Sequence, residues 1–113
     1  GYMVTQIEAQ TAKENCIGVL GLSFKPESDD VRDTPAAKVI SALIADGYTN
    51  IVAYDPLAME AFDRQYHLSI AYAESMDAVL AQADEVVILT AWKEFADVPA
   101  RTQNRIVDCR YML

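Results

Sequence analysis

The feature that most limits what this chain can fold into is the stretch of residues 18–35, which reads GVLGLSFKPESDDVRDTP. An apolar run ends there in Gly21, a long polar loop follows, and Thr34 and Pro35 begin a periodic apolar segment. This order is typical of a strand, a loop and a helix, and open α/β sheets bind their ligands at such strand ends. Glycine lets a backbone approach a phosphate closely, and a helix start offers free N–H groups. The loop also carries Lys25 and Arg32, whose side chains suit phosphate oxygens.

The glycine spacing by itself is a weak signal. The dinucleotide-binding fingerprint is G-x-G-x-x-G, whereas this chain has Gly18-x-x-Gly21 and places Phe24 where a third glycine would fall. Spacing alone therefore leaves two interpretations open: a phosphate site, and a tight turn with a solvated run of charged residues.

Hydrophobic periodicity predicts the rest of the fold. Thr34 is a candidate N-cap and Pro35 fits the first helical position, while Gly47 can end the helix in the left-handed conformation. Nearly unalternating apolar strands that are separated by helices indicate parallel strands covered on both faces. The sequence predicts strands at residues 16–20, 51–54, 85–90 and 105–109, and a short strand or extended link at 68–71. It predicts helices at residues 34–46 and 75–83, and a further helix after Asp55.

These elements predict the α/β class, as a three-layer, Rossmann-like open parallel sheet of about five strands with helices on both faces. Residues 1–15 are expected to form a lead-in helix, and residues 16–113 a single domain. The 113 residues, 52% of them hydrophobic, are enough for one domain with a sizeable core.

Charge and apolar patterning exclude several functions. The net charge of −8 argues against nonspecific binding of nucleic acid. No apolar run approaches the ~18 residues of a membrane span, and the N-terminus lacks a signal-peptide pattern, so we expect a cytoplasmic protein without membrane contacts. Cys16 and Cys109 are far apart and His67 has no cysteine pair near it, so we expect reduced thiols and no metal site.

Several ordered motifs together are much more specific than the glycines. They are residues 21–26 (GLSFKP), 29–35 (DDVRDTP), 54–56 (YDP), 83–95 (ADEVVILTAWKEF) and 107–110 (VDCR). In this order they resemble the C-terminal, nucleotide-sugar-binding domain of the UDP-glucose/GDP-mannose dehydrogenase family. The resemblance covers residues 17–110, nearly the whole chain.

The resemblance implies a function and a set of site residues. The family oxidises the C6 hydroxymethyl group of a nucleotide sugar to a carboxylate with two NAD in succession, as a homo-oligomer. Phe24 and Lys25 match residues that contact the substrate, and Arg110 matches an arginine at the nucleotide part of the substrate. Arg32 matches an arginine that reaches toward NAD, and Asp30 is expected to pair with Arg32. The partner is then a UDP-sugar, with GDP-mannose also open.

Other observations limit what this chain is expected to do alone. The family binds NAD mainly through an N-terminal domain, and its fingerprint, catalytic cysteine and supporting lysine have no counterpart here. Gly1 in place of an initiator methionine fits a processed chain or an excised fragment. Because the NAD fingerprint and the catalytic cysteine have no counterpart here, we expect this chain by itself to bind ligand weakly, if at all, to hold no catalytic residue and to show no turnover. Cys109 stands where the family usually has glycine and Tyr111 where asparagine is common, and both departures lie beside Arg110.

Four questions remain open at this level. Asp55 fits an N-cap for the following helix or, as in dinucleotide folds, a ribose ligand. Trp92 and Phe95 fit either the wall of a ligand pocket or a cap on the core. A non-catalytic nucleotide-binding or scaffolding domain is an alternative function. So is a receiver-like signalling module, in which Asp55 would accept a phosphoryl group and Thr90 would lie near it.

Overall fold

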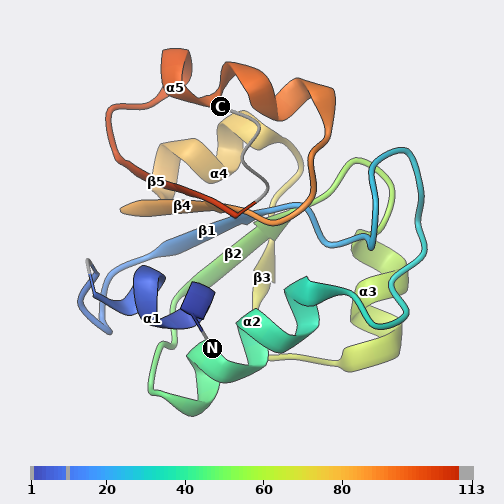
Figure 1. Ribbon diagram of the computed structural model, residues 1–113, viewed down its shortest axis with the longest axis horizontal. Helices are drawn as coiled ribbons and strands as arrows, with labels where there is room; N and C mark the ends of the chain where they lie inside the picture. The colour runs from blue at the N-terminus through green and yellow to red at the C-terminus, as the bar shows by residue number, and fades with distance from the viewer. Residues whose placement is uncertain (1, 10, 110–113) are drawn as a thin grey trace.

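A five-stranded sheet forms the centre of the protein, as seen in a computed structural model that describes residues 2–9 and 11–109 (Figure 1). The strands lie in the order β3-β2-β1-β4-β5, and all four neighbouring pairs are parallel. Their bounds are β1 Ile17–Leu20, β2 Ile51–Tyr54, β3 Ala71–Tyr72, β4 Glu85–Ile88 and β5 Arg105–Asp108. The predicted open parallel sheet of about five strands is therefore confirmed.

Helices cover both faces of this sheet, which gives the predicted three layers. In Figure 1, α1 and α2 lie below the sheet, and α4 and α5 lie above it. The apolar side chains accordingly divide into two clusters, one with α1, α2 and α3 and the other with α4, the 3-10 helix and α5. The helix bounds are α1 Tyr2–Glu8, α2 Pro35–Ala45, α3 Met59–Tyr66, α4 Met76–Gln82, the 3-10 helix η1 Lys93–Asp97 and α5 Val98–Arg101.

The best-predicted helix is α2, and its ends have the expected chemistry. Thr34 is the N-cap, and its hydroxyl accepts a hydrogen bond from the N–H of Ala36 at 3.4 Å. Pro35 occupies the first turn, where its missing N–H costs nothing. Beyond the C-cap, Gly47 has a φ of 101°, the left-handed conformation that glycine adopts most easily.

Other boundaries differ from the sequence prediction by a few residues. The lead-in helix ends at Glu8, well before residue 15, and β4 ends at Ile88, two residues before Thr90. His67 is the exposed C-cap of α3, with a φ of 49°. Cys16 and Cys109 are both thiols, as expected.

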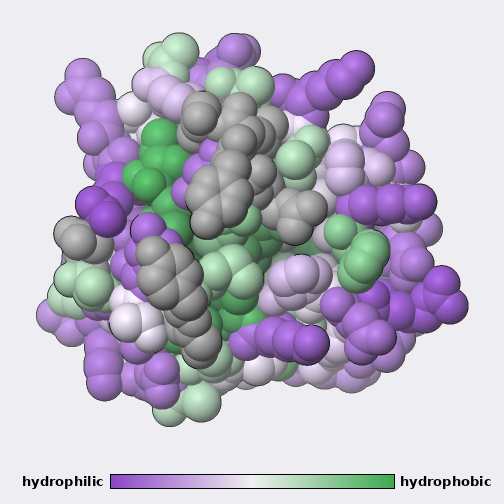
Figure 2. Space-filling model, in the orientation of Figure 1, coloured by the Kyte–Doolittle hydropathy of each residue, from purple (hydrophilic) through white to green (hydrophobic). Residues whose placement is uncertain are grey.

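The face of the protein drawn in Figure 2 is mostly hydrophilic. Figure 2 shows hydrophilic residues over the outer part of one face and hydrophobic residues gathered near its middle. None of the helices within residues 2–9 and 11–109 combines the length and apolar character that crossing a membrane requires.

A buried carboxylate lies at the opposite edge of the sheet from the polar loop. Glu85, at the start of β4, is fully buried, and its Oε2 lies 3.3 Å from Nε of Arg105. Burial raises the pKa of Glu85, while the nearby Thr11 hydroxyl and the charge of Arg105 lower that pKa by less. Glu85 therefore takes up a proton more readily in the folded chain than in the unfolded chain.

We expect Glu85→Gln to reduce the pH dependence of stability. A pKa that is higher in the folded state means that the folded chain binds more protons above pH 4.5, so the unchanged protein loses stability as pH rises through the folded-state pKa of Glu85. Glutamine cannot ionise, so the free energy of unfolding of the variant rises relative to that of the unchanged protein over the same pH interval. Urea unfolding between pH 4.5 and 8 measures this, and the exposed Glu74→Gln serves as the control. Parallel pH profiles for all three proteins would contradict the expectation.

Candidate functional site

The candidate site lies where the order of the strands reverses. β1 is paired with β2 on one side and with β4 on the other. From the carboxyl ends of β1 and β4 the chain runs to opposite faces of the sheet, to α2 below and to η1 above (Figure 1). Open α/β sheets bind ligands at this switch point. The polar loop that the sequence singles out therefore begins at the expected edge.

Gly21 allows the segments after β1 and β4 to approach each other closely. Its N–H donates to the carbonyl of Tyr54 at 2.9 Å, and its φ is 99°. A Cβ atom at this position would lie 2.5 Å from the backbone nitrogen of Thr90 and 2.7 Å from its hydroxyl oxygen. Only glycine fits here, and the contact places Thr90 beside the root of the loop.

Side chains from three separate elements bind every backbone polar group of Leu22 and Ser23. The carboxylate of Asp55, after β2, accepts from both N–H groups, at 2.8 and 3.1 Å. The Thr34 hydroxyl donates to the carbonyl of Leu22 at 2.8 Å. The Thr90 hydroxyl donates to the carbonyl of Ser23 at 2.7 Å. We call these two residues the loop anchor.

Asp55 is turned inward, away from any ligand. It is fully buried, and its second oxygen accepts from the N–H groups of Leu57 and Ala58, both at 2.9 Å. The N-cap position of α3 is Ala58, so Asp55 binds the turn before this helix in addition to the loop anchor. Burial of both oxygens supports neither a ribose ligand nor a phosphoryl acceptor at this position.

Beyond the anchor, the loop projects into solvent. The N–H of Phe24 donates to the carbonyl of Asp30 at 2.8 Å, which closes the loop on itself. Phe24 is 53% exposed, and the neighbouring Lys25 is also exposed. The loop thus presents an aromatic ring and an ammonium group side by side in the sequence, as a nucleotide ligand would require.

Asp30 and Arg32 form the expected ion pair. Nε and Nη2 of Arg32 donate to the two oxygens of Asp30 at 3.1 and 3.0 Å, and the backbone N–H of Arg32 adds a bond at 3.1 Å. These hydrogen bonds, and less strongly the charges of Arg32 and Lys25, lower the pKa of Asp30 to about 2. The same pairing raises the pKa of Arg32. The carboxylate occupies one edge of the guanidinium, so the Nη1 edge faces away from it.

Two of the predicted site residues share one surface pocket. A pocket of about 300 Å³ is lined by Phe24, Asp30, Arg32 and Asp33. Lys25 does not line it, although its charge contributes to lowering the pKa of Asp30. Arg110 lies outside the described residues, so its placement relative to this pocket remains a prediction.

Trp92 and Phe95 have different roles. A second pocket, of about 220 Å³, lies at the same edge and is lined by Trp92 together with Pro26 and Pro56, among others. Phe95, in contrast, is fully buried and packs edge-to-face on Tyr54 with a centroid distance of 6.4 Å. Trp92 therefore lines a pocket, whereas Phe95 is part of the core.

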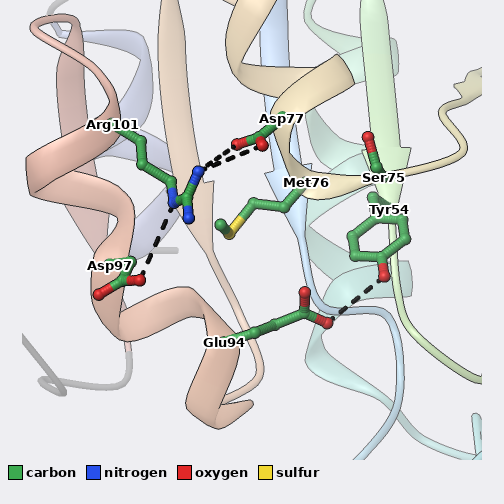
Figure 3. Close-up of a pocket in the computed structure, with 7 residues that line it drawn as sticks. All are labelled: Tyr54, Ser75, Met76, Asp77, Glu94, Asp97 and Arg101. Atoms are coloured by element: carbon green, nitrogen blue, oxygen red, sulfur yellow. Dashed lines mark hydrogen bonds and ion pairs between the residues drawn. The ribbon is translucent and has the colours of Figure 1, made fainter.

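A third pocket was not foreseen from the sequence. It measures about 230 Å³, and Figure 3 shows Arg101 between Asp77 and Asp97 on one side, with Glu94 and Tyr54 on the other. Arg101 donates to Asp77 at 3.2 and 3.3 Å, and the hydroxyl of Tyr54 donates to Glu94 at 3.4 Å. The charged groups of this pocket pair with one another or with Tyr54. Within the described ranges, no group of three or more His, Cys, Asp and Glu side chains is arranged to hold a metal ion.

Comparisons with known proteins agree with this geometry. Residues 18–113 match the sequence profile described as "UDP-glucose/GDP-mannose dehydrogenase family, UDP binding domain". The chain is 44% identical over 98 residues to a UDP-glucose 6-dehydrogenase of Haloferax volcanii, covering 83% of this chain and 22% of that enzyme. It is 43% identical over 79 residues to a UDP-glucose 6-dehydrogenase of Rhizobium meliloti, covering 70% of this chain and 18% of that enzyme.

Solved structures show the same relationship. A UDP-glucose dehydrogenase from the archaeon Pyrobaculum islandicum superposes with a TM-score of 0.86 at 33% identity, over 97% of this chain and 26% of that one. A GDP-mannose dehydrogenase from Pseudomonas aeruginosa, in a ternary complex, superposes with a TM-score of 0.79 at 26% identity, over 94% of this chain and 26% of that one. The chain therefore spans about a quarter or less of each relative named here.

Proposed function

Since this chain belongs to the UDP-glucose/GDP-mannose dehydrogenase family, whose UDP-binding domain it matches, we propose that it binds the nucleotide half of a UDP-sugar. The intact protein would be an NAD-dependent UDP-sugar 6-dehydrogenase and a homo-oligomer, as the resemblance implies. The observation that carries the proposal is the rigidly anchored loop after β1, which presents Phe24 and Lys25 at the switch point of the sheet.

The loop has the groups that a nucleotide diphosphate needs. The Lys25 ammonium offers three charged donors to phosphate oxygens, and an exposed Phe24 offers an apolar surface to the ligand. Arg110 would add a second cation from the end of β5. β1 and β5 end on the same edge of an all-parallel sheet, and Lys25 and Arg110 follow these two strands in the sequence, which supports this part of the proposal.

Arg32 fits a role toward the diphosphate of NAD. Its side chain is 83% exposed, and Asp30 holds one edge of the guanidinium while leaving the Nη1 edge for an anion. When bound, NAD accepts the hydride that the substrate loses. This chain would contribute only a contact to the cofactor, so we expect no NAD reduction from UDP-glucose by this chain alone.

The test compares two alanine variants. Lys25→Ala should weaken UDP binding about tenfold, the factor that about 1.4 kcal/mol corresponds to, and weaken NAD binding less. Arg32→Ala should do the reverse, because its free edge suits the cofactor's diphosphate. Titration of the ¹⁵N-labelled chain with UDP, GDP and NAD measures all three affinities, and comparison of UDP with GDP identifies the base.

Lys38→Ala is the matched control, because Lys38 is also an exposed lysine but lies on α2. Its variant should bind all three ligands as the unchanged chain does. Equal losses for both ligands in both loop variants would contradict the division between Lys25 and Arg32. No shift of any loop resonance at millimolar UDP would favour the scaffolding alternative.

A further inference from the structure

The loop anchor is held by buried side-chain hydrogen bonds, whereas the side-chain hydrogen bonds of the loop that it carries are exposed or only partly buried. The four polar side chains that bind it or belong to it are buried: Ser23, Thr34, Asp55 and Thr90. All four backbone polar groups of Leu22 and Ser23 have a side-chain partner at 3.1 Å or less. A fully satisfied buried polar network of this kind fixes one arrangement of the backbone.

The exposed part of the loop has weaker restraints. The Ser23 hydroxyl donates to the carbonyl of Lys25 at 2.9 Å, which ties the start of the loop to the anchor. Further along, the bonds include the closing bond from Phe24 to Asp30, the bond from the Asp30 N–H to the Ser28 hydroxyl at 3.0 Å, and the exposed pair of Asp30 with Arg32. Exposed ion pairs add little rigidity. The direction in which Phe24 and Lys25 leave the sheet is therefore set mainly by the anchor before them.

Thr90 is the member of this network that links the two halves of the sheet across the switch point. Its hydroxyl comes from the segment after β4 and donates to Ser23, 67 residues away in the sequence. The absence of a side chain at Gly21 leaves the space for this approach. Thr34 and Asp55, in contrast, come from the α2 and β2 side.

We propose that Thr90 is a positioning residue for the nucleotide site. Its hydroxyl holds the carbonyl of Ser23 so that Phe24 and Lys25 face the bound diphosphate. The inference rests on the proposed function, because it assigns Thr90 a part in UDP binding without contact to UDP. It predicts that loss of one buried hydroxyl alters affinity through the loop.

The test uses the full chain and UDP itself. Thr90→Val keeps the shape of the side chain but removes the donor, and should weaken UDP binding about tenfold. Thr90→Ser restores a hydroxyl and should bind within about twofold of the unchanged chain. Thr49→Val, an exposed threonine after α2, is the control and should change nothing. If Thr90→Val does not fold, Thr90→Ala removes the hydroxyl without placing a methyl group against the carbonyl.

A double-mutant cycle separates positioning from a general loss of stability. If Thr90 acts through the loop, Thr90→Val should cost much less UDP affinity in a Lys25→Ala background than in the unchanged chain. Amide exchange of Phe24 and Lys25 should also become faster in Thr90→Val and return in Thr90→Ser.

Each result has a distinct meaning. A folded Thr90→Val chain that binds UDP as tightly as the unchanged chain overturns the inference alone. The inference is also overturned if the fold-loss of UDP affinity in the double variant equals the product of the losses in Thr90→Val and Lys25→Ala. Failure of the unchanged chain to bind UDP overturns the proposed function, and the inference with it.

Discussion

Gly21→Ala is expected to lower the free energy of unfolding by about 3 kcal/mol. The φ of 99° is already unfavourable for any residue with a side chain. The added Cβ would also lie 2.5 Å from the backbone nitrogen of Thr90, and a backbone atom cannot rotate away as a side chain can. The variant must therefore separate the segments after β1 and β4, which breaks the hydrogen bond from Thr90 to Ser23.

Gly47→Ala provides the matched control, because Gly47 has almost the same φ, 101°. The nearest atom to its added Cβ is Cδ of Lys13, at 3.3 Å, which is the flexible part of a side chain. Only the cost of the left-handed backbone applies there, about 1 kcal/mol. Urea unfolding of both variants measures the difference, and equal losses would show that the approach of Thr90 to Gly21 does not determine the cost.

The elements that follow from the sequence are those whose signal is local. The strand Ile51–Tyr54 is a short apolar run between turns, and α2 has an apolar stripe with an N-cap and a glycine at its end. The lead-in helix is less well predicted, because its apolar stripe is sparse and the exposed residues 12–14 add no packing face. β4 ends early because the chain turns after Leu89, whose N–H still donates to Leu20, so that Thr90 meets the loop.

The candidate site likewise contains residues that the sequence predicts and contacts that the sequence does not reveal. Phe24, Lys25 and Arg32 are recognisable because they lie in one motif after a strand, and the pairing of Asp30 with Arg32 joins residues two positions apart. The hydrogen bonds of the loop anchor join residues 12, 32, 33 and 67 positions apart, and in each of them a threonine hydroxyl donates or the Asp55 carboxylate accepts. Such contacts leave no periodic pattern. The available hint is that Asp55 and Thr90 are polar residues directly after apolar strands.

The inward turn of Asp55 has a large energetic consequence. Asp55→Ala is expected to lower the free energy of unfolding by about 3–5 kcal/mol. The carboxylate accepts from four backbone N–H groups, those of Leu22, Ser23, Leu57 and Ala58. Alanine leaves these donors without an acceptor in a buried place where water cannot replace it easily, and each unsatisfied donor carries a desolvation cost.

Two further variants identify the source of this loss. Asp77→Ala removes an exposed carboxylate that pairs with Arg101, and should cost no more than about 1 kcal/mol. Asp55→Asn keeps the size of the side chain but directs an NH₂ group at some of the same N–H donors, so it should recover only part of the stability lost in Asp55→Ala. If Asp55→Asn were as stable as the unchanged chain, the space filled by the side chain, rather than its role as an acceptor, would hold the loops after β1 and β2 together. The loop anchor would then depend on Thr34 and Thr90 alone.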